Sequence, residues 1–149
     1  MMRRTFIKAA GTGTLAVLAA AASGFSLAAT NEPVKVVYHV VDGIDQATRG
    51  MGNIRNHLRE SPDTKIVVVA HGEGINFLLE GAQDRNGNPF EAAVAALASQ
   101  GVEFKVCNNT LTARGIPANK LVLEAKVVPA GVVEVARLQA HEGYVYLRP

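Results

Sequence analysis

The sequence predicts an α/β fold, a three-layer α/β/α domain built around a mostly parallel sheet of about five strands. Two observations carry this prediction: three apolar runs have the length of strands, and helical patterns separate these runs. Near-continuous apolar runs are typical of strands that are buried on both faces, as in parallel sheets. Strands that alternate with helices favour right-handed crossovers, which place helices on both faces of the sheet. The three runs are VKVVYHVV (34–41), KIVVVAH (65–71) and VEFKVC (102–107).

The first 29 residues stand apart from this pattern. They contain Arg3 and Arg4, then a mildly apolar stretch rich in Ala, Gly and Thr, and then small residues suited to cleavage. This arrangement is typical of an export signal, and the paired arginines resemble those of bacterial twin-arginine signals. We therefore expect a signal peptide at 1–29, one domain at 30–149 and a location in the periplasm. An uncleaved N-terminal anchor is the alternative.

The composition limits the classes of partner and reaction. The chain has a formal net charge of +2, but the signal contributes only basic residues, so the remaining domain is close to neutral. Such a domain gives no reason to expect nucleic acid as a partner, or a membrane surface after signal cleavage. The chain has no glycine-rich phosphate loop, no G-x-S-x-G motif and no second cysteine. Assignment as a nucleotide hydrolase, serine hydrolase or structural zinc protein is therefore weakened, and we predict neither a cofactor nor a bound metal.

A helix is predicted at 45–60, between the first two strands. Its apolar residues recur at steps of three and four, as expected for a helix with one buried face. Asp45 is predicted to cap the start of this helix, and Ser61 with Pro62 marks its end. The apolar stripe consists of Ala47, Met51, Ile54 and Leu58.

A second helix is predicted between the second and third strands, from Phe90 to Gly101. Pro89 suits its first turn, and Gly101 suits its C-terminal cap. The polar segment at 81–89 precedes this helix. It is either an ordinary connector or a mobile flap over a site.

The C-terminal third is predicted to contain shorter elements. A helix follows the third strand at 108–115, with Asn108 or Asn109 as its cap and Gly115 as its stop. Residues 121–123 form either a short strand or a helical turn. The domain is completed by a strand near 126–128, a helix at 132–141 and a last strand at 144–147.

Three polar side chains stand at the ends of the predicted strands. Asp42 follows the first strand, His71 ends the second and Cys107 ends the third. Ligands of open parallel sheets bind beyond the carboxyl ends of the strands, so these residues are candidates for one site. Asp42 is more simply explained as a turn former.

Cys107 is the strongest candidate, because it is the only cysteine and stands at a strand-to-helix junction. Backbone N–H groups at the start of a helix stabilise a thiolate, and a thiolate attacks sulfur compounds and binds soft metals. We therefore expect its sulfur atom to be held in the open, in the ionised state. A buried and inert cysteine is the alternative.

Among the histidines, His71 is the one expected at the site. It opens the segment HGEG, whose residues Gly72 and Gly74 permit a tight turn and a close approach of the backbone. His71 would stabilise an anionic sulfur species or transfer a proton; the alternative is a hydrogen bond to the loop backbone. His39 lies among valines within the first strand and is expected to be a core residue.

Three segments of the chain resemble the DsrE/DsrF-like family, which includes the YchN-type proteins. The resemblance extends from about Val34 to Pro149 and implies one α/β/α domain that forms homo- or hetero-oligomers. Sulfur-handling members of the family carry persulfide sulfur on a cysteine and pass it to a partner, so the resemblance implies that role for Cys107. The segments are KIVVVAHGEGINFLL (65–79), ALASQGVEFKVCNNTL (96–111) and VVPAGVVEVARLQAHEGYVYLRP (127–149).

The leading expectation is a periplasmic sulfur carrier, or sulfurtransferase-like protein, that holds a persulfide on Cys107. His71 is expected to assist. The expected partners are further copies of this chain and a protein that donates or accepts sulfur. Groups that would bind the anionic sulfur are predicted at Gly72, Asn108, Asn109 and Thr110.

Two alternatives remain open. One is an oligomeric module that binds a small ligand or a soft metal such as Cu(I), using Cys107 with His71 or His39. The other is an interaction subunit without chemistry of its own, which would expose an apolar surface to a stable partner.

Overall fold

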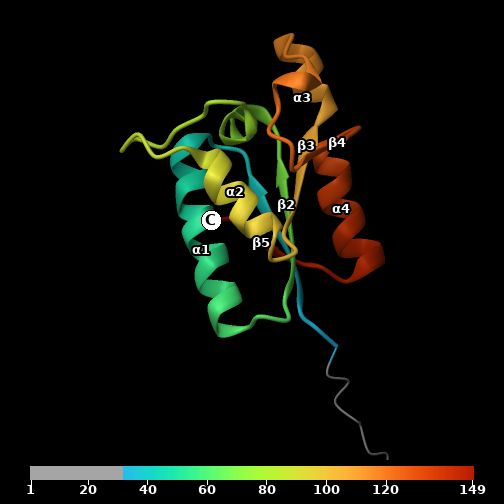
Figure 1. Ribbon diagram of the computed structural model, residues 1–149. Helices are drawn as coiled ribbons and strands as arrows, with labels where there is room; N and C mark the ends of the chain where they lie inside the picture. Colours follow the sequence, from blue (N-terminus) through green and yellow to red (C-terminus); the bar gives the residue numbers. More distant parts are fainter. Residues whose placement is uncertain (1–31) are drawn as a thin grey trace, which may run out of the picture. The chain divides into compact units, whose positions relative to one another are not determined.

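The computed structural model describes residues 32–149, and these contain one five-stranded sheet (Figure 1). The predicted signal peptide at 1–29 lies outside the described residues. The strand order is β4-β3-β2-β1-β5, and every neighbouring pair is parallel. The predicted α/β class with a parallel sheet is therefore confirmed. The strands are β1 (Lys35–Val40), β2 (Lys65–Ala70), β3 (Glu103–Cys107), β4 (Ala125–Val128) and β5 (Val145–Leu147).

Helices cover both faces of this sheet, which gives the three predicted layers. α1 (Ile44–Glu60) and α2 (Phe90–Ala98) lie on one face, and α4 (Gly131–Glu142) lies on the other (Figure 1). Within residues 32–149, no helix is both long enough and apolar enough to span a bilayer. The shorter helical segments are the 3₁₀ helices η1 (Gly72–Leu78) and η2 (Ala118–Lys120) and the α-helix α3 (Asn108–Arg114).

Side-chain alternation along the strands builds an apolar core on each face of the sheet. The larger core joins the sheet to α1 and α2, and it includes Ile54 and Leu97. The predicted stripe of α1 is confirmed, because all four of its apolar residues are buried. The smaller core joins the sheet to α4 and consists of Val37, Val67, Val69, Val135 and Leu138.

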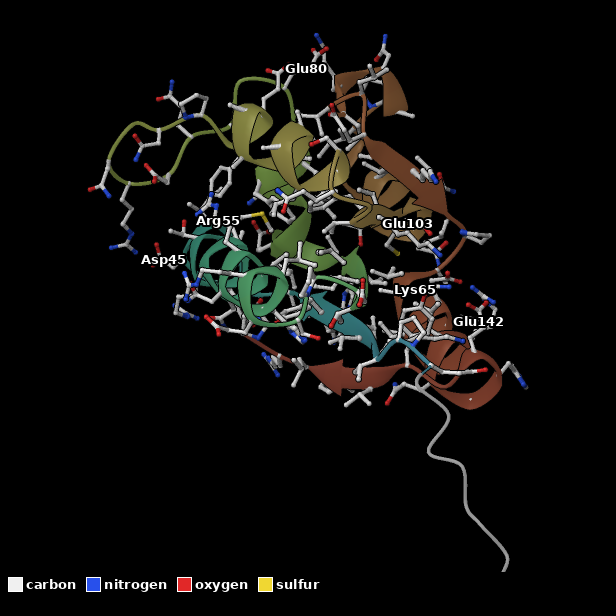
Figure 2. All side chains as sticks on the ribbon, turned by 60° about the horizontal axis from the view of Figure 1, so that its bottom comes forward. Asp45, Arg55, Lys65, Glu80, Glu103 and Glu142 are labelled. Carbon is white, nitrogen blue, oxygen red and sulfur yellow. The ribbon has the colours of Figure 1, made fainter. Side chains whose placement is uncertain are left out.

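The direction of α4 brings its start to the carboxyl ends of the strands. Lys65 opens β2, Glu103 opens β3 and Glu142 closes α4, and Figure 2 shows these three residues on the same side of the molecule. Lys35 at the start of β1 also donates a hydrogen bond to the backbone oxygen of Glu142, with 3.2 Å between the two atoms. The helix therefore runs back along the sheet, and its first turn, at Gly131, lies at the opposite edge.

The start of α1 differs from the prediction. Asp45 does not cap this helix; no side chain does. The side chain of Gln46 is buried instead, and its Oε1 accepts hydrogen bonds from the backbone N–H groups of Val41 (2.6 Å) and Asp42 (2.7 Å). The buried amide of Gln46 thus accepts hydrogen bonds from the free N–H groups of the turn after β1. Asp45 forms an ion pair with Arg85 instead.

Hydrogen bonds distinguish between the alternative structures predicted for two further segments. In the polar segment 81–89, Oδ1 of Asp84 accepts hydrogen bonds from the N–H groups of Asn86 (2.8 Å) and Asn88 (2.9 Å). These bonds favour the connector interpretation over a mobile flap. At 121–123 there is no regular strand: Leu121 forms an isolated antiparallel bridge with Leu79, and a single turn follows, in which the N–H of Ala125 donates to the oxygen of Val122 at 3.1 Å.

Candidate functional site

The register of the sheet places His39, His71 and Cys107 on one face. His39 lies opposite Val69, and Val69 lies opposite Lys105. Side chains alternate along a strand, so His71 and Cys107, each two residues further on, face the same side as His39. Val69 belongs to the core beneath α4, so this is the face that α4 covers.

Gly131, the first residue of α4, lies directly against two of these side chains. A Cβ atom on Gly131 would lie 3.2 Å from the Cβ atom of Cys107 and 3.2 Å from that of His71. Such distances are tighter than ordinary packing, so glycine is the residue that lets the helix start this close to the sheet. The first turn of α4 therefore brings Cys107 and His71 together.

Cys107 is buried, with 6% of its surface exposed, so the expectation of a sulfur atom held in the open is wrong. Burial raises the pKa of the Cys107 thiol, but hydrogen bonding outweighs this effect and the resulting pKa is lower than usual. The donors, in order of effect, are the N–H of Gly131, the hydroxyl and N–H of Thr110, and the N–H of Asn109. The thiolate is thus stabilised by protein donors in place of water.

Two helices start beside this sulfur. Cys107 is the N-cap residue of α3, and Gly131 opens α4. The prediction that Asn108 or Asn109 caps α3 is wrong, because both residues lie inside the helix and are exposed. Among the described residues, the backbone N–H of Asn109 makes the smallest contribution to the thiol and also donates to the backbone oxygen of Pro129 at 3.3 Å, whereas Asn108 contributes no donor. The start of a helix favours a negative charge, so both helices act in the same direction on Cys107.

Thr110 joins the cysteine to the segment that follows β2. Its Oγ1 accepts a hydrogen bond from the backbone N–H of Gly72 at 3.0 Å, and its hydroxyl proton is directed to Cys107. The predicted donor Gly72 therefore serves the site through Thr110. Arg114, which sequence reasoning missed, strengthens this junction, because its Nη1 donates to the backbone oxygen of Gly72 (3.3 Å) and to Oδ1 of Asn76 (2.8 Å).

His71 contacts a second histidine. Its Nε2 atom lies 2.7 Å from Nε2 of His39, and Nδ1 of His39 lies 2.9 Å from the hydroxyl oxygen of Tyr146. His39 is partly exposed, so its interpretation as a core residue is wrong. Burial lowers the pKa of both histidines, which favours their neutral forms. The pairing of β1 with both β2 and β5 creates this contact, and the sequence alone does not specify that pairing.

An ion-pair cluster fixes α4 to β3 beside the cysteine. Nζ of Lys105 lies 2.6 Å from Oε1 of Glu134, and Nη2 of Arg137 lies 2.8 Å from the same oxygen. Hydrogen bonds from Arg137 and Lys105 hold the pKa of Glu134 at about 2, although burial opposes them. Lys105 precedes Cys107 by two residues, so the cluster holds the first turn of α4 over the site. Sequence reasoning missed all three charged residues.

Asp42, the third strand-end candidate, forms its ion pair with Arg148 and not with Cys107 or His71. Its carboxylate is exposed and pairs with Arg148, with Oδ2 at 2.7 Å from Nη2. Within residues 32–149, no group of three or more His, Cys, Asp or Glu side chains is arranged to hold a metal ion. The site therefore consists of one thiol, its donors and a histidine pair.

Comparisons with known proteins agree with this architecture. The profile of the DsrE/DsrF-like family matches residues 8–149. A solved protein of unknown function from Methanobacterium thermoautotrophicum is 32% identical, with a TM-score of 0.69 over 78% of this chain and 99% of that chain. The ychN protein of E. coli shares the fold at 15% identity, with a TM-score of 0.61 over 77% of this chain and 96% of that chain. A comparison with curated proteins found no match. Since the family profile spans nearly the whole sequence, this chain belongs to the DsrE/DsrF-like family.

Proposed function

We propose that this protein is a sulfur carrier in which Cys107 accepts a sulfane sulfur, holds it as a persulfide and passes it to a partner thiol. DsrE-like proteins are often linked to sulfur relay. The observation that supports this role here is the set of donors from Gly131, Thr110 and Asn109 that lowers the pKa of Cys107. An inert core cysteine does not need such donors, whereas a nucleophilic thiolate does.

The proposed transfer needs no external oxidant or reductant. The Cys107 thiolate attacks the outer sulfur of the donor, and a new S–S bond forms as the donor's own bond to that sulfur breaks. The electron pair of the broken bond leaves on sulfite if the donor is thiosulfate, or on a thiolate if the donor is a persulfide. A partner thiolate then attacks the outer sulfur of the Cys107 persulfide, and Cys107 leaves as the thiolate that began the cycle.

The burial of Cys107 and the position of His71 fit this cycle. A sulfur atom with so little exposed surface is reached only by a small donor or by the extended end of a partner chain. His71 lies beside Cys107 at Gly131, and a neutral imidazole can accept the proton of an incoming thiol.

Mass spectrometry of the intact protein tests this function. After incubation with thiosulfate or polysulfide, the wild-type chain should gain the mass of one sulfur atom, and a thiol reductant should remove it. Cys107→Ser should gain none. A wild-type chain that takes up no sulfur, or a variant that takes up as much, would contradict the proposal.

We also propose that the carrier works in the periplasm as a homo-oligomer. The location rests on the sequence of 1–29 alone. Assembly is supported by large apolar residues that are exposed away from β5, namely Leu123 (95%), Val132 (60%) and Val133 (62%). Exposed apolar surface of this kind is a typical contact surface between chains. Cell fractionation of the full chain and sedimentation of the mature protein test these points; a cytoplasmic or monomeric protein would contradict them.

A soft-metal module is the second candidate, because a thiol and two imidazoles lie in one row. Thiolate and imidazole are suitable ligands for Cu(I). Metal analysis of protein purified from the periplasm separates the two candidates. A stoichiometric metal that is lost in Cys107→Ala would favour the module, whereas a persulfide on metal-free protein would favour the carrier.

A further inference from the structure

We propose that Tyr146, His39 and His71 form a proton relay between solvent at the β5 edge and the sulfur atoms that react at Cys107. This inference rests on the proposed sulfur chemistry and adds His39 and Tyr146 to it. The row follows the strand order, with Tyr146 on β5, His39 on β1, His71 after β2 and Cys107 at the end of β3. Tyr146 lies opposite Val37 in the sheet, so its side chain is on the same face as His39.

Two of the three links in this row are direct contacts. The hydroxyl oxygen of Tyr146 lies 2.9 Å from Nδ1 of His39, and Nε2 of His39 lies 2.7 Å from Nε2 of His71. The third link rests on proximity. The position that a Cβ atom on Gly131 would take lies 3.2 Å from the Cβ atom of His71 and 3.2 Å from that of Cys107, so these two residues are neighbours. In the described part of the chain no hydrogen bond joins these two side chains, so the last transfer passes through the substrate or a water molecule.

The geometry of the histidine pair links the protonation of its two rings. Only one proton fits between ring nitrogens 2.7 Å apart. When Nε2 of His39 carries this proton, Nδ1 of His39 accepts a hydrogen bond from Tyr146. When Nε2 of His71 carries it, Nδ1 of His39 is protonated and donates to the Tyr146 oxygen. A proton that enters at one end therefore shifts the shared proton and releases another at the far end, and neither ring keeps a charge.

The surroundings favour the neutral rings that such a relay requires. Burial lowers the pKa of His39 and of His71. The charge of His71 lowers the pKa of His39 further, and the exposed pair of Arg148 and Asp42 acts in opposite directions, with Arg148 lowering and Asp42 raising it. Because a neutral imidazole is both a donor and an acceptor, each ring can receive and release a proton at neutral pH.

Both halves of the sulfur transfer need a proton to move. In loading from a persulfide donor, the leaving thiolate takes a proton that water supplies through Tyr146, His39 and His71. In unloading, the partner thiol must lose its proton before it attacks, and the relay carries that proton outward. Loading from thiosulfate is different, because sulfite is a weaker base than a thiolate and leaves without a proton.

The difference between the two donors provides the test. Single-turnover loading of Cys107 is followed by intact mass, with a low-molecular-weight persulfide and with thiosulfate, in the wild type, His39→Gln and Tyr146→Phe. His39→Gln should slow loading from the persulfide by about tenfold or more, because an amide does not relay protons. Loading from thiosulfate should slow much less than loading from the persulfide, because sulfite leaves without a proton. Tyr146→Phe should show a smaller loss of the same kind.

Two controls make the result specific. His57→Gln removes a similar contact, since Nδ1 of His57 lies 3.1 Å from the hydroxyl of Tyr38, but this pair lies on the opposite face of the sheet and should leave both rates unchanged. Free imidazole should restore the loading of His39→Gln from the persulfide.

The outcomes separate the relay from the sulfur carrier itself. Normal loading of the wild type with equal rates in His39→Gln, or an equal loss with both donors, would overturn the relay alone. A wild type that loads from neither donor would refute the sulfur carrier, and the relay with it. A persulfide-specific loss that imidazole reverses would support both.

Discussion

The hydroxyl oxygen of Thr110 lies 3.0 Å from the backbone nitrogen of Gly72 and accepts its hydrogen bond, which leaves the hydroxyl proton for Cys107. One side chain thereby ties the start of α3 to the segment after β2 and supplies a donor to the thiol. Because both partners of the hydroxyl are held by the fold, its orientation toward the sulfur is set before any substrate arrives.

Removal of the Thr110 hydroxyl should make the thiolate form of Cys107 less stable relative to the thiol. Thr110→Val should raise the pKa of Cys107, because the valine removes one hydrogen bond to the anion. The pH dependence of alkylation by iodoacetamide measures this pKa. Thr110→Ser keeps the hydroxyl and should stay close to the wild type. Identical profiles for the valine variant and the wild type would show that the hydroxyl is not a donor to the sulfur.

A methyl group at Gly131 should disturb the site directly. In Gly131→Ala the new Cβ lies 3.2 Å from the Cβ atoms of Cys107 and His71, so the start of α4 must shift away. We expect a loss of about 1 kcal/mol in the free energy of unfolding and a higher pKa for Cys107. Gly52→Ala is the matched control, because a Cβ there has no atom within 4 Å. An unchanged thiol pKa in Gly131→Ala would contradict the assigned donor.

Gly74 should tolerate no larger residue. A Cβ atom at this position would lie 2.1 Å from the backbone oxygen of Val40, which cannot rotate away as a side chain can. Gly74→Ala should therefore lower the free energy of unfolding by at least about 2 kcal/mol, the range of overpacked core sites. Urea unfolding measures this change, and a variant as stable as the wild type would show that η1 does not pack against the end of β1 as described.

The ion pairs of Glu134 should make stability fall in acid. The pKa of Glu134 is lowered from 4.5 to about 2 in the folded chain, so its stabilisation is complete above pH 4.5. The stabilisation is then lost as the pH falls from 4.5 toward about 2. A shift of this size corresponds to about 3 kcal/mol, and solvent screening reduces it little because the Glu134 side chain is only 11% exposed.

Urea unfolding at neutral and acidic pH measures this contribution. Glu134→Gln should be less stable than the wild type at neutral pH and should show a smaller loss of stability in acid. Glu60→Gln is the control, since Glu60 forms an exposed pair with Arg59 and should change the pH profile little. Equal acid sensitivity of the wild type and Glu134→Gln would contradict the assigned role of the cluster.

The sequence by itself determined the features that depend on neighbouring residues. The apolar runs correspond to β1, β2 and β3, and the stripe with Ile54 at its centre is the buried side of α1. Cys107 stands at the end of β3, and Gly115 ends α3 in the left-handed region with a φ of 61°. These features follow from side-chain periodicity and from the backbone preferences of single residues, which act over a few positions of the chain.

Only the tertiary structure decided which strand ends are neighbours and what surrounds the thiol. Tyr146 and His39 are 107 positions apart, and the sheet order brings them into contact. The backbone N–H of Gly131, a donor to Cys107, belongs to a different helix, α4, and Glu134 holds that helix in place. Periodicity records which face of an element is buried, but the pairing of strands and the docking of α4 depend on the packing free energy of the whole domain.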